Sequence, residues 1–177
     1  MIVLDASALI EVLLRTRVGA AIELRMFAPG ETLHAPHLID IETTQVLRRH
    51  VAKGAIDAKR GREAIQDVAT LALRRYGHES LLPRVWEMRD NLTAYDAVYV
   101  ALAQALDAPL LTCDRRLAAA AGHRARIEAM CPLAVVHSEG PRHPSPYPSP
   151  SPQEAGSGIR RPSRAGALYP RFMAGLK

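Results

Sequence analysis

Short apolar runs alternate with segments of helical spacing along residues 1–137, and this alternation limits the possible folds more than any other feature. Residues 2–6 are nearly all apolar, as in strands that are covered on both faces. Strands that alternate with helices form parallel sheets with helices on both sides. The pattern therefore predicts a three-layer α/β/α domain with a short, mainly parallel central sheet. Its strands are expected at residues 2–6, 32–35, 78–82, 109–113 and 133–136.

The segments between these runs have apolar residues at the spacing of helices. Ser7, Asp57 and Asp114 are each placed to cap the start of a helix. The clearest helix covers residues 93–106, where small and branched apolar residues form a wide face. Helices are expected at residues 7–13, 20–26, 37–54, 58–73, 85–91, 93–106 and 114–121.

Residues 138–177 differ in composition from the rest of the chain. Eight prolines, five glycines and six serines stand among these 40 residues, and residues 141–152 carry too little apolar surface to fold. We expect a folded domain at residues 1–137 and a disordered tail at residues 138–177. The tail has six basic and two acidic residues, whereas the domain has 17 and 16. The formal net charge of +5 therefore says little about the domain.

Several classes of protein are disfavoured by composition. The chain has no apolar run of about 18 residues and no basic leader before its first strand, so we expect a cytoplasmic protein without a membrane partner. Aromatic residues make up 5% of the chain, which argues against an aromatic platform for stacking nucleic-acid bases. Cys113 and Cys131 lack the spacing of metal ligands and are interpreted as small buried residues.

Four acidic residues fall where the predicted layout brings separate segments together. Asp5 ends the first strand and Asp114 follows the strand at residues 109–113, so both belong to one sheet edge. Asp96 lies in the first turn of its helix, and Glu42 lies about one turn inside the helix that starts near His37. Taken singly, each has an ordinary explanation as a helix cap or a solvated helix residue.

Together the four acids favour a different interpretation. A half-buried carboxylate is costly unless it is paired, and several converging carboxylates repel one another unless a cation neutralises them. No histidine or cysteine falls among them, and oxygen donors of this kind select a hard ion such as Mg²⁺ or Mn²⁺. Such a site binds phosphate oxygens and prepares water to attack them.

At these residues the chain resembles PIN-domain proteins and, within that family, the VapC toxins of bacterial toxin–antitoxin pairs. The resemblance covers most of residues 1–137 and rests on segments 2–14, 38–49, 91–106 and 110–118. It implies an endoribonuclease that depends on Mg²⁺ or Mn²⁺. It also implies RNA as substrate, a VapB-like antitoxin as partner and a homodimer.

The resemblance also assigns roles to individual residues. The family's four acidic positions fall on Asp5, Glu42, Asp96 and Asp114. Of these, Asp5, Asp96 and Asp114 would bind the metal, and Glu42 would orient the attacking water or a second ion. Supporting roles fall to the hydroxyls of Ser7 and Thr112 and to the amide of Asn91, while Arg115 and Arg116 could bind RNA phosphates. A helix cap remains an equally good interpretation of Ser7.

Three alternative functions fit part of this pattern. A haloacid-dehalogenase-type phosphotransferase needs a second acid two residues after the first, where this chain has Ser7. A non-catalytic module could use the acids only to recruit a basic partner. A housekeeping RNA-processing nuclease would share the site but lack an antitoxin.

The basic cluster of Arg48, Arg49 and His50 is interpreted as a solvated helix face.

Overall fold

The computed structural model describes residues 1–130. The strand expected at residues 133–136, Cys131, the domain boundary near residue 137 and the tail at residues 138–177 all lie outside the described residues. Cys113 is half-buried and packs against the core, as expected for a small apolar residue.

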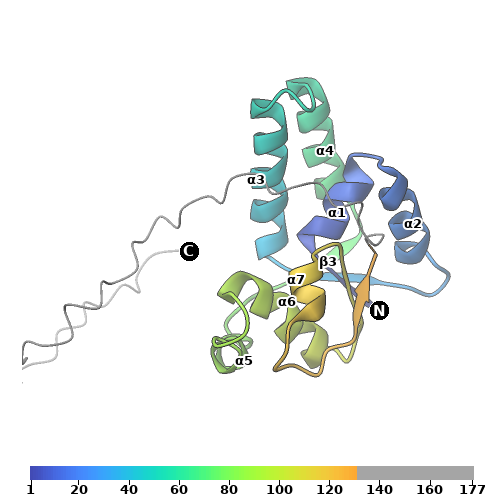
Figure 1. Cartoon of the computed structure of the whole chain (residues 1–177). Coiled ribbons are helices and arrows are strands. Elements are labelled where there is room, and N and C mark those ends of the chain that lie inside the picture. The colour runs from blue at the N-terminus through green and yellow to red at the C-terminus, as the bar shows by residue number, and fades with distance from the viewer. Residues whose placement is uncertain (131–177) are drawn as a thin grey trace, which may run out of the picture. The chain divides into compact units, whose positions relative to one another are not determined.

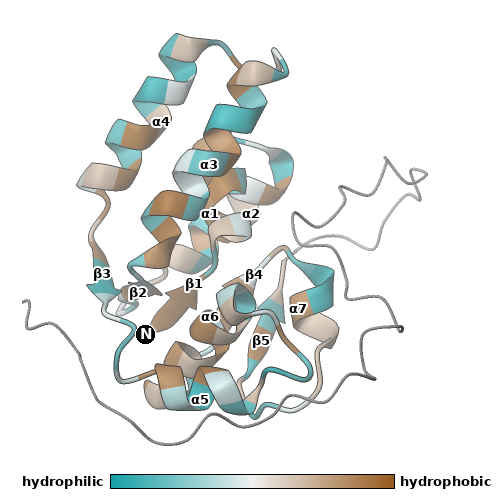
Figure 2. Ribbon diagram, turned by 90° about the vertical axis from the view of Figure 1, so that its left-hand side faces the viewer, coloured by the Kyte–Doolittle hydropathy of each residue, from teal (hydrophilic) through white to brown (hydrophobic). Residues whose placement is uncertain are grey.

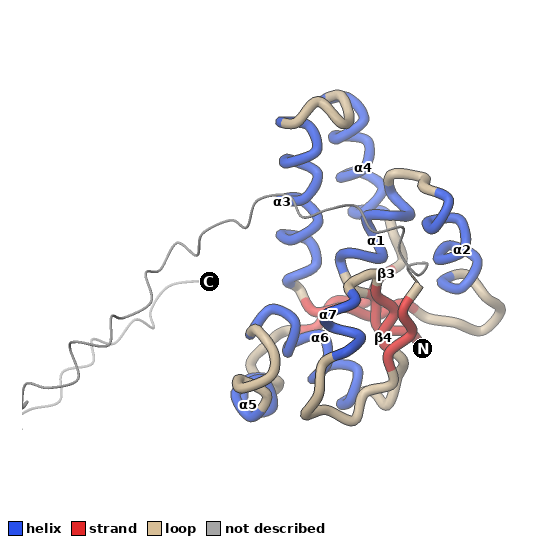
Figure 3. Tube along the Cα trace, viewed as in Figure 1, coloured by secondary structure: helices blue, strands red, loops and turns tan. Residues whose placement is uncertain are grey.

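A five-stranded parallel sheet forms the centre of the described part (Figure 3). Its strands lie in the order β3-β2-β1-β4-β5, and every pair of neighbours is parallel. This confirms the expected central sheet and places β1 and β4 side by side at its middle. The strands are β1 (Ile2–Leu4), β2 (Leu33–Pro36), β3 (Leu73–Tyr76), β4 (Leu110–Thr112) and β5 (Ile127–Ala129).

Helices cover both faces of the sheet, so the three-layer prediction is also confirmed (Figure 1). One layer holds α1 (Ala6–Leu13), α2 (Arg17–Met26), α3 (Leu38–Ala52) and α4 (Ala58–Thr70). The other layer holds α5 (Leu82–Glu87) and α6 (Ala94–Ala105), while α7 (Arg115–Ala119) packs against β4 and β5. Helices α3 and α4 pack on each other as a hairpin that extends well beyond the sheet (Figures 1 and 3).

A large part of the core lies between β1 and α6. All three residues of β1 are fully buried, and α6 buries seven residues in succession, from Ala97 to Ala103. The hydropathy colouring shows the same concentration of apolar residues on β1 and α6 (Figure 2). Because α6 packs against β1, β2 and β4, its first turn is held near the edge where those strands end.

One helix end and one strand were predicted at the wrong positions. Helix α4 ends at Thr70 rather than residue 73, because Leu71 adopts extended backbone and Leu73 begins β3. Residues 78–82, expected as a strand, form a turn and the start of α5. Strand β3 lies at the sheet edge and has the sequence LRRY. Its arginines interrupt the apolar run that would predict a strand, so its position was missed. Arg75, for example, is half-buried and forms an ion pair with Asp40 at 2.8 Å.

The strand β5 was not predicted. It is an edge strand in which no residue is fully buried, so it lacks the apolar run that marks a central strand. Its pairing with β4 relies on main-chain registers such as Leu110 with Ile127.

Helices α1 and α2 approach each other closely at Gly19. The hydroxyl of Thr16 caps α2 by accepting from the Gly19 amide at 2.9 Å, which starts the helix three residues earlier than expected. A Cβ atom at position 19 would lie 2.1 Å from the carbonyl oxygen of Glu11. That contact is with rigid backbone, so glycine is required there for α1 and α2 to pack.

Gly19→Ala should therefore destabilise the fold by about 1–3 kcal/mol, as overpacking does. In an exposed helix the same change stabilises by about 1 kcal/mol, so the sign itself is informative. Urea unfolding of the two chains measures the difference, with Ala21→Gly on the exposed side of α2 as a comparison for helix propensity alone. An increase in the free energy of unfolding for Gly19→Ala would contradict the close approach.

Candidate active site at the carboxyl end of the sheet

Asp5 and Asp114 follow the two central strands at the edge where parallel strands place their sites. Asp5 comes directly after β1, and its amide donates to the carbonyl of Leu111 on β4 at 3.0 Å. Asp114 comes two residues after β4. The two acids lie close enough for the charge of Asp114 to contribute, as the smallest of several causes, to the pKa of Asp5.

Two hydroxyl groups hold the Asp5 carboxylate. Thr112 donates to Asp5 Oδ2 at 2.7 Å from the end of β4, and Ser7 donates to the same oxygen from the first turn of α1. The two hydroxyls lie 3.1 Å apart. Asp5 is only 8% exposed, so this buried acid is joined to both neighbouring elements by neutral donors.

The backbone after β4 completes the network. The Cys113 amide donates to Ser7 Oγ at 2.9 Å, and the Asp114 amide donates to Thr112 Oγ1 at 2.9 Å. Ser7 and Thr112 thus each accept from the loop that carries Asp114 and donate to Asp5. Both hydroxyls contact Asp5, and their supporting role in the site stays a prediction. The helix-cap interpretation of Ser7 was wrong: Asp5 occupies the cap position of α1, without a side-chain cap hydrogen bond.

Burial is the main cause that raises the pKa of the Asp5 carboxyl above its ordinary value of 3.8. The hydrogen bonds from Ser7 and Thr112 oppose this shift, because they favour the charged form. The negative charge of Asp114 adds to it. The site therefore contains a carboxylate whose charge is incompletely compensated by the protein.

Glu42 reaches the same region from α3. Its Oε2 accepts a hydrogen bond of 2.5 Å from the hydroxyl of Tyr99, which lies on α6 in the opposite layer. Burial raises the pKa of Glu42, the hydrogen bond from Tyr99 lowers it, and the charges of Asp5 and Asp96 raise it further. The pKa of Glu42 therefore depends on the charges of two of the other three acids.

Tyr99 is the site residue that sequence reasoning missed. It is 1% exposed and lies three residues after Asp96, so one helix face carries both residues toward the acids. A signal for it exists in the sequence: a tyrosine within the apolar face of a buried helix needs a partner for its hydroxyl. Burial, followed by the hydrogen bond to Glu42, holds the pKa of Tyr99 well above its usual value of 10.0, so it remains a donor.

Asp96 and Asp114 also serve as helix-start residues, as their ordinary interpretation predicts. The Thr93 hydroxyl caps α6 by accepting from the Asp96 amide at 3.1 Å, and it donates to Asp96 Oδ2 at 2.7 Å. Asp114 Oδ1 accepts from the amides of Arg116 and Leu117 at 2.7 and 3.3 Å. Capping and membership of the acidic cluster are therefore compatible.

The remaining predicted residues lie at the rim of this region. Arg115 and Arg116 are exposed in the first turn of α7, next to Asp114. Asn91 is exposed and precedes α6, where its side-chain amide lies so close to Gly122 that a Cβ there would be 2.4 Å from Asn91 Nδ2. Asn91 thus packs against the loop after α7 rather than against the four acids.

The donor set suits a hard cation, because it consists of carboxylate and hydroxyl oxygens. Within residues 1–130, no three His, Cys, Asp or Glu side chains are grouped closely enough to hold a metal ion as they stand. Asp96 and Asp114 each direct an oxygen into the cap of a helix.

The raised pKa of Asp5 leads to a stability test in the presence of a chelator. An acid whose pKa is higher in the folded chain binds a proton more readily there, so stability falls as the pH rises through the shifted pKa. Asp5→Asn removes this loss while it keeps an acceptor for Thr112. We expect its melting temperature at pH 7 to be about 2–5 °C above that of the unchanged chain, with the difference vanishing at low pH.

Asp90→Asn is the matched control, because it removes one carboxylate from an exposed loop. Thermal unfolding in EDTA between pH 4 and pH 8 distinguishes the two variants. Equal melting temperatures for Asp5→Asn and the unchanged chain at pH 7 would contradict the claim that the buried charge of Asp5 lowers stability.

Comparisons with known proteins show which family the chain resembles in sequence. The PIN domain family model matches residues 2–123. The chain is 44% identical to Ribonuclease VapC9 of Mycobacterium tuberculosis over 136 residues, which cover 77% of this chain and 98% of that protein. It is 41% identical to Ribonuclease VapC12 of the same species over 128 residues, which cover 72% and 98%.

Solved structures share the fold. PAE2754 from Pyrobaculum aerophilum superposes with a TM-score of 0.56 at 24% identity, covering 71% of this chain and 81% of that one. VapBC2 from Rickettsia felis, solved bound to a DNA fragment from the promoter of the pair, gives a TM-score of 0.55 at 14% identity, covering 73% and 98%. None of the helices in residues 1–130 has the length and apolar character needed to cross a membrane. The chain belongs to the PIN domain family and, within that family, is similar to the VapC ribonucleases.

Proposed function

We propose that this protein is a Mg²⁺- or Mn²⁺-dependent endoribonuclease and the toxin of a VapBC-type toxin–antitoxin pair. The observation that carries the proposal is the coupling of acids from four distant segments: Asp5 and Asp114 follow the neighbouring strands β1 and β4, and the charges of Asp5 and Asp96 act on Glu42. The names of the relatives, which are ribonucleases, support RNA as the substrate.

Asp5, Asp96 and Asp114 are the residues that would hold the cation. When bound, a divalent cation of this class lowers the pKa of water and offsets the charge that develops on a phosphate under attack. The chain contributes a buried carboxylate at Asp5, which Ser7 and Thr112 keep in one orientation. Because both hydroxyl donors are neutral, the negative charge of Asp5 stays available to a cation.

Glu42 is placed to accept a proton from the attacking water. Its raised pKa brings it closer to the working pH of a general base than an exposed glutamate would be. The hydrogen bond from Tyr99 fixes one of its oxygens across the two helical layers, so the other can face the substrate. Arg115 and Arg116, exposed beside Asp114, are placed to contact RNA phosphates.

The proposal includes a VapB-like antitoxin, which is supported by the VapBC2 pair among the similar structures. It also includes a homodimer. Leu82, Trp86 and Tyr95 expose between 56% and 69% of their surface on α5 and α6, and large apolar side chains of this kind are typical of protein interfaces. A cytoplasmic location follows from the RNA substrate that we propose.

Two other functions would use the same residues. A non-catalytic binding module would keep the acidic edge but cleave no RNA with any cation. A housekeeping nuclease would cleave RNA without an antitoxin, and a small antitoxin-like reading frame directly upstream would argue against it. The raised pKa values of Asp5 and Glu42 favour catalysis, because a surface that only recruits basic partners does not need buried acids.

Asp96→Asn tests catalysis directly. We expect cleavage of a single-stranded RNA oligonucleotide in Mg²⁺ to fall by at least about 100-fold, because a lost ligand weakens both cation binding and charge stabilisation. Asp90→Asn should stay within about twofold of the unchanged chain. Gel-resolved cleavage with Mg²⁺, with Mn²⁺ and with EDTA measures this effect, and circular dichroism checks the fold. Cleavage that persists in EDTA would remove the proposed metal dependence.

Tyr99→Phe tests the hydrogen bond to Glu42. Loss of that bond leaves the pKa of Glu42 higher, so less of the base is deprotonated at a given pH and the acid limb of the rate profile should move to higher pH. We expect about a tenfold lower rate near neutral pH. Tyr95→Phe, on the exposed side of α6, is the control. An unshifted pH profile for Tyr99→Phe would show that Tyr99 only packs.

A further inference from the structure

Helix α3 carries a row of residues that begins at the acidic cluster and continues with positive charge. Glu42, Val46, Arg49 and Lys53 are separated by four, three and four residues, which is the spacing of one helix face. Lys53 still has helical backbone, with φ −86° and ψ −1°, so the row extends to the end of the helix.

Helix geometry places the two basic residues relative to Glu42. At about 100° per residue, Arg49 and Lys53 each fall within roughly 20° of the direction of Glu42 around the helix axis. At 1.5 Å per residue they lie about 10 and 16 Å further along that axis. A strand that passes the acids and follows α3 would therefore meet Arg49 first and Lys53 next.

Both basic residues are free to take a new partner. Arg49 and Lys53 are exposed, and neither forms an ion pair with any of residues 1–130. Two cations outside this row are engaged: Arg60 on α4 pairs with Glu63 and Asp67, and Arg75 pairs with Asp40. Two cations that form no ion pair and lie in line with an acidic site suit a polyanion that extends away from that site.

We infer that Arg49 and Lys53 form a phosphate-binding track, which holds the RNA backbone one to three nucleotides from the bond that is cleaved. The inference rests on the proposed function and extends it, because it states that the bound RNA backbone extends from the acids along α3. Arg48, Arg49 and His50 therefore do not form one solvated basic face, because Arg49 lies on the side of α3 that carries Glu42.

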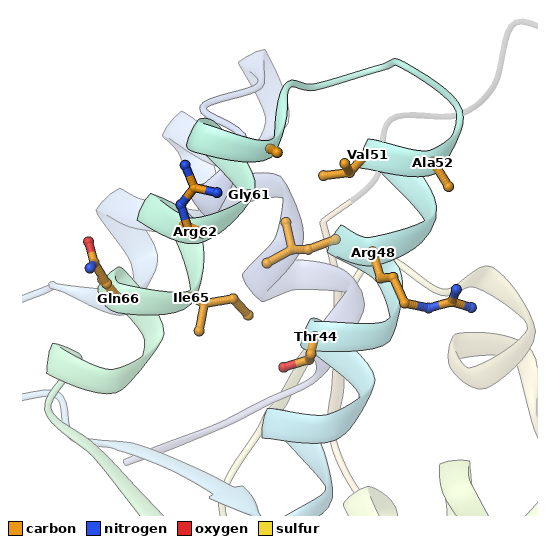
Figure 4. Close-up of a pocket in the computed structure, with 10 residues that line it drawn as sticks. Thr44, Arg48, Val51, Ala52, Gly61, Arg62, Ile65 and Gln66 are labelled. Atoms are coloured by element: carbon orange, nitrogen blue, oxygen red, sulfur yellow. The ribbon is translucent and has the colours of Figure 1, made fainter.

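Arg48 is the natural comparison, since it precedes Arg49 but points about 100° away around the helix. With Arg62 of α4, it lines an open pocket of about 650 Å³ between α3 and α4 (Figure 4). The pair of Arg48 and Arg62 thus carries the same charge, on the same hairpin, at a face turned away from Glu42. This pair provides a matched control for general electrostatic attraction.

The binding experiment uses the full chain with Asp5→Asn, which keeps RNA intact, and a fluorescent single-stranded RNA oligonucleotide. Arg49→Ala combined with Lys53→Ala should raise the dissociation constant about tenfold and reduce the slope of log K against log salt by about 1.4, as expected for two lost phosphate contacts. Arg48→Ala combined with Arg62→Ala should change the dissociation constant less than about twofold. Equal losses in both double variants would overturn the track.

The cleavage experiment uses the two double variants without Asp5→Asn. The track variant should raise KM about tenfold at an unchanged kcat, because it removes contacts away from the reacting phosphate. If the unchanged chain cleaves RNA and the track variant has the same KM, the track is wrong and the nuclease stands. If nothing cleaves but the track variant still loses RNA binding, the nuclease is wrong and the track stands. A track variant that binds RNA normally but fails to pair with antitoxin would overturn the track in favour of a protein contact.

Discussion

The burial of the Asp5 carboxylate between β1, β4 and α1 is the constraint on which the site depends. Thr112 and Ser7 donate to one of its oxygens, and each of them accepts from the backbone that leads to Asp114. The four hydrogen bonds therefore fix the two strand ends relative to each other. Parallel pairing of β1 with β4 brings the segments together, but the hydroxyl network sets the positions of the acids.

A second link joins the two helical layers at the same place. Tyr99 on α6 donates to Glu42 on α3, across the end of the sheet. Since α6 is buried along most of its length and α3 projects away from the sheet, this bond ties the hairpin of α3 and α4 to a buried helix. Glu42 and the basic residues further along α3 are thereby oriented from one fixed point.

The sequence predicted the central sheet and the acids because both leave strong local signals. Residues 2–4 are wholly buried and read as an apolar run, and Asp5 interrupts such a run at its end. The edge strands β3 and β5 lack that signal, since solvent covers one side of them and arginine or glutamate can occupy their positions. Ser7 was ambiguous because a hydroxyl after a strand suits a cap as well as a carboxylate. The pairing of Tyr99 with Glu42 joins residues 57 apart, and only the placement of α3 and α6 at the same end of the sheet decides it.

The choice of neutral groups around Asp5 has a chemical consequence. An arginine at the position of Thr112 would also satisfy the buried carboxylate, and it would do so more strongly, but its charge would cancel the attraction for a cation. Hydroxyls lower the cost of burial only in part, which is why the pKa of Asp5 stays raised. Part of the stability that full pairing would provide is thus given up at this point. The neighbouring charges of Asp114 and Glu42 add to that cost, and binding a divalent cation would relieve all three at once.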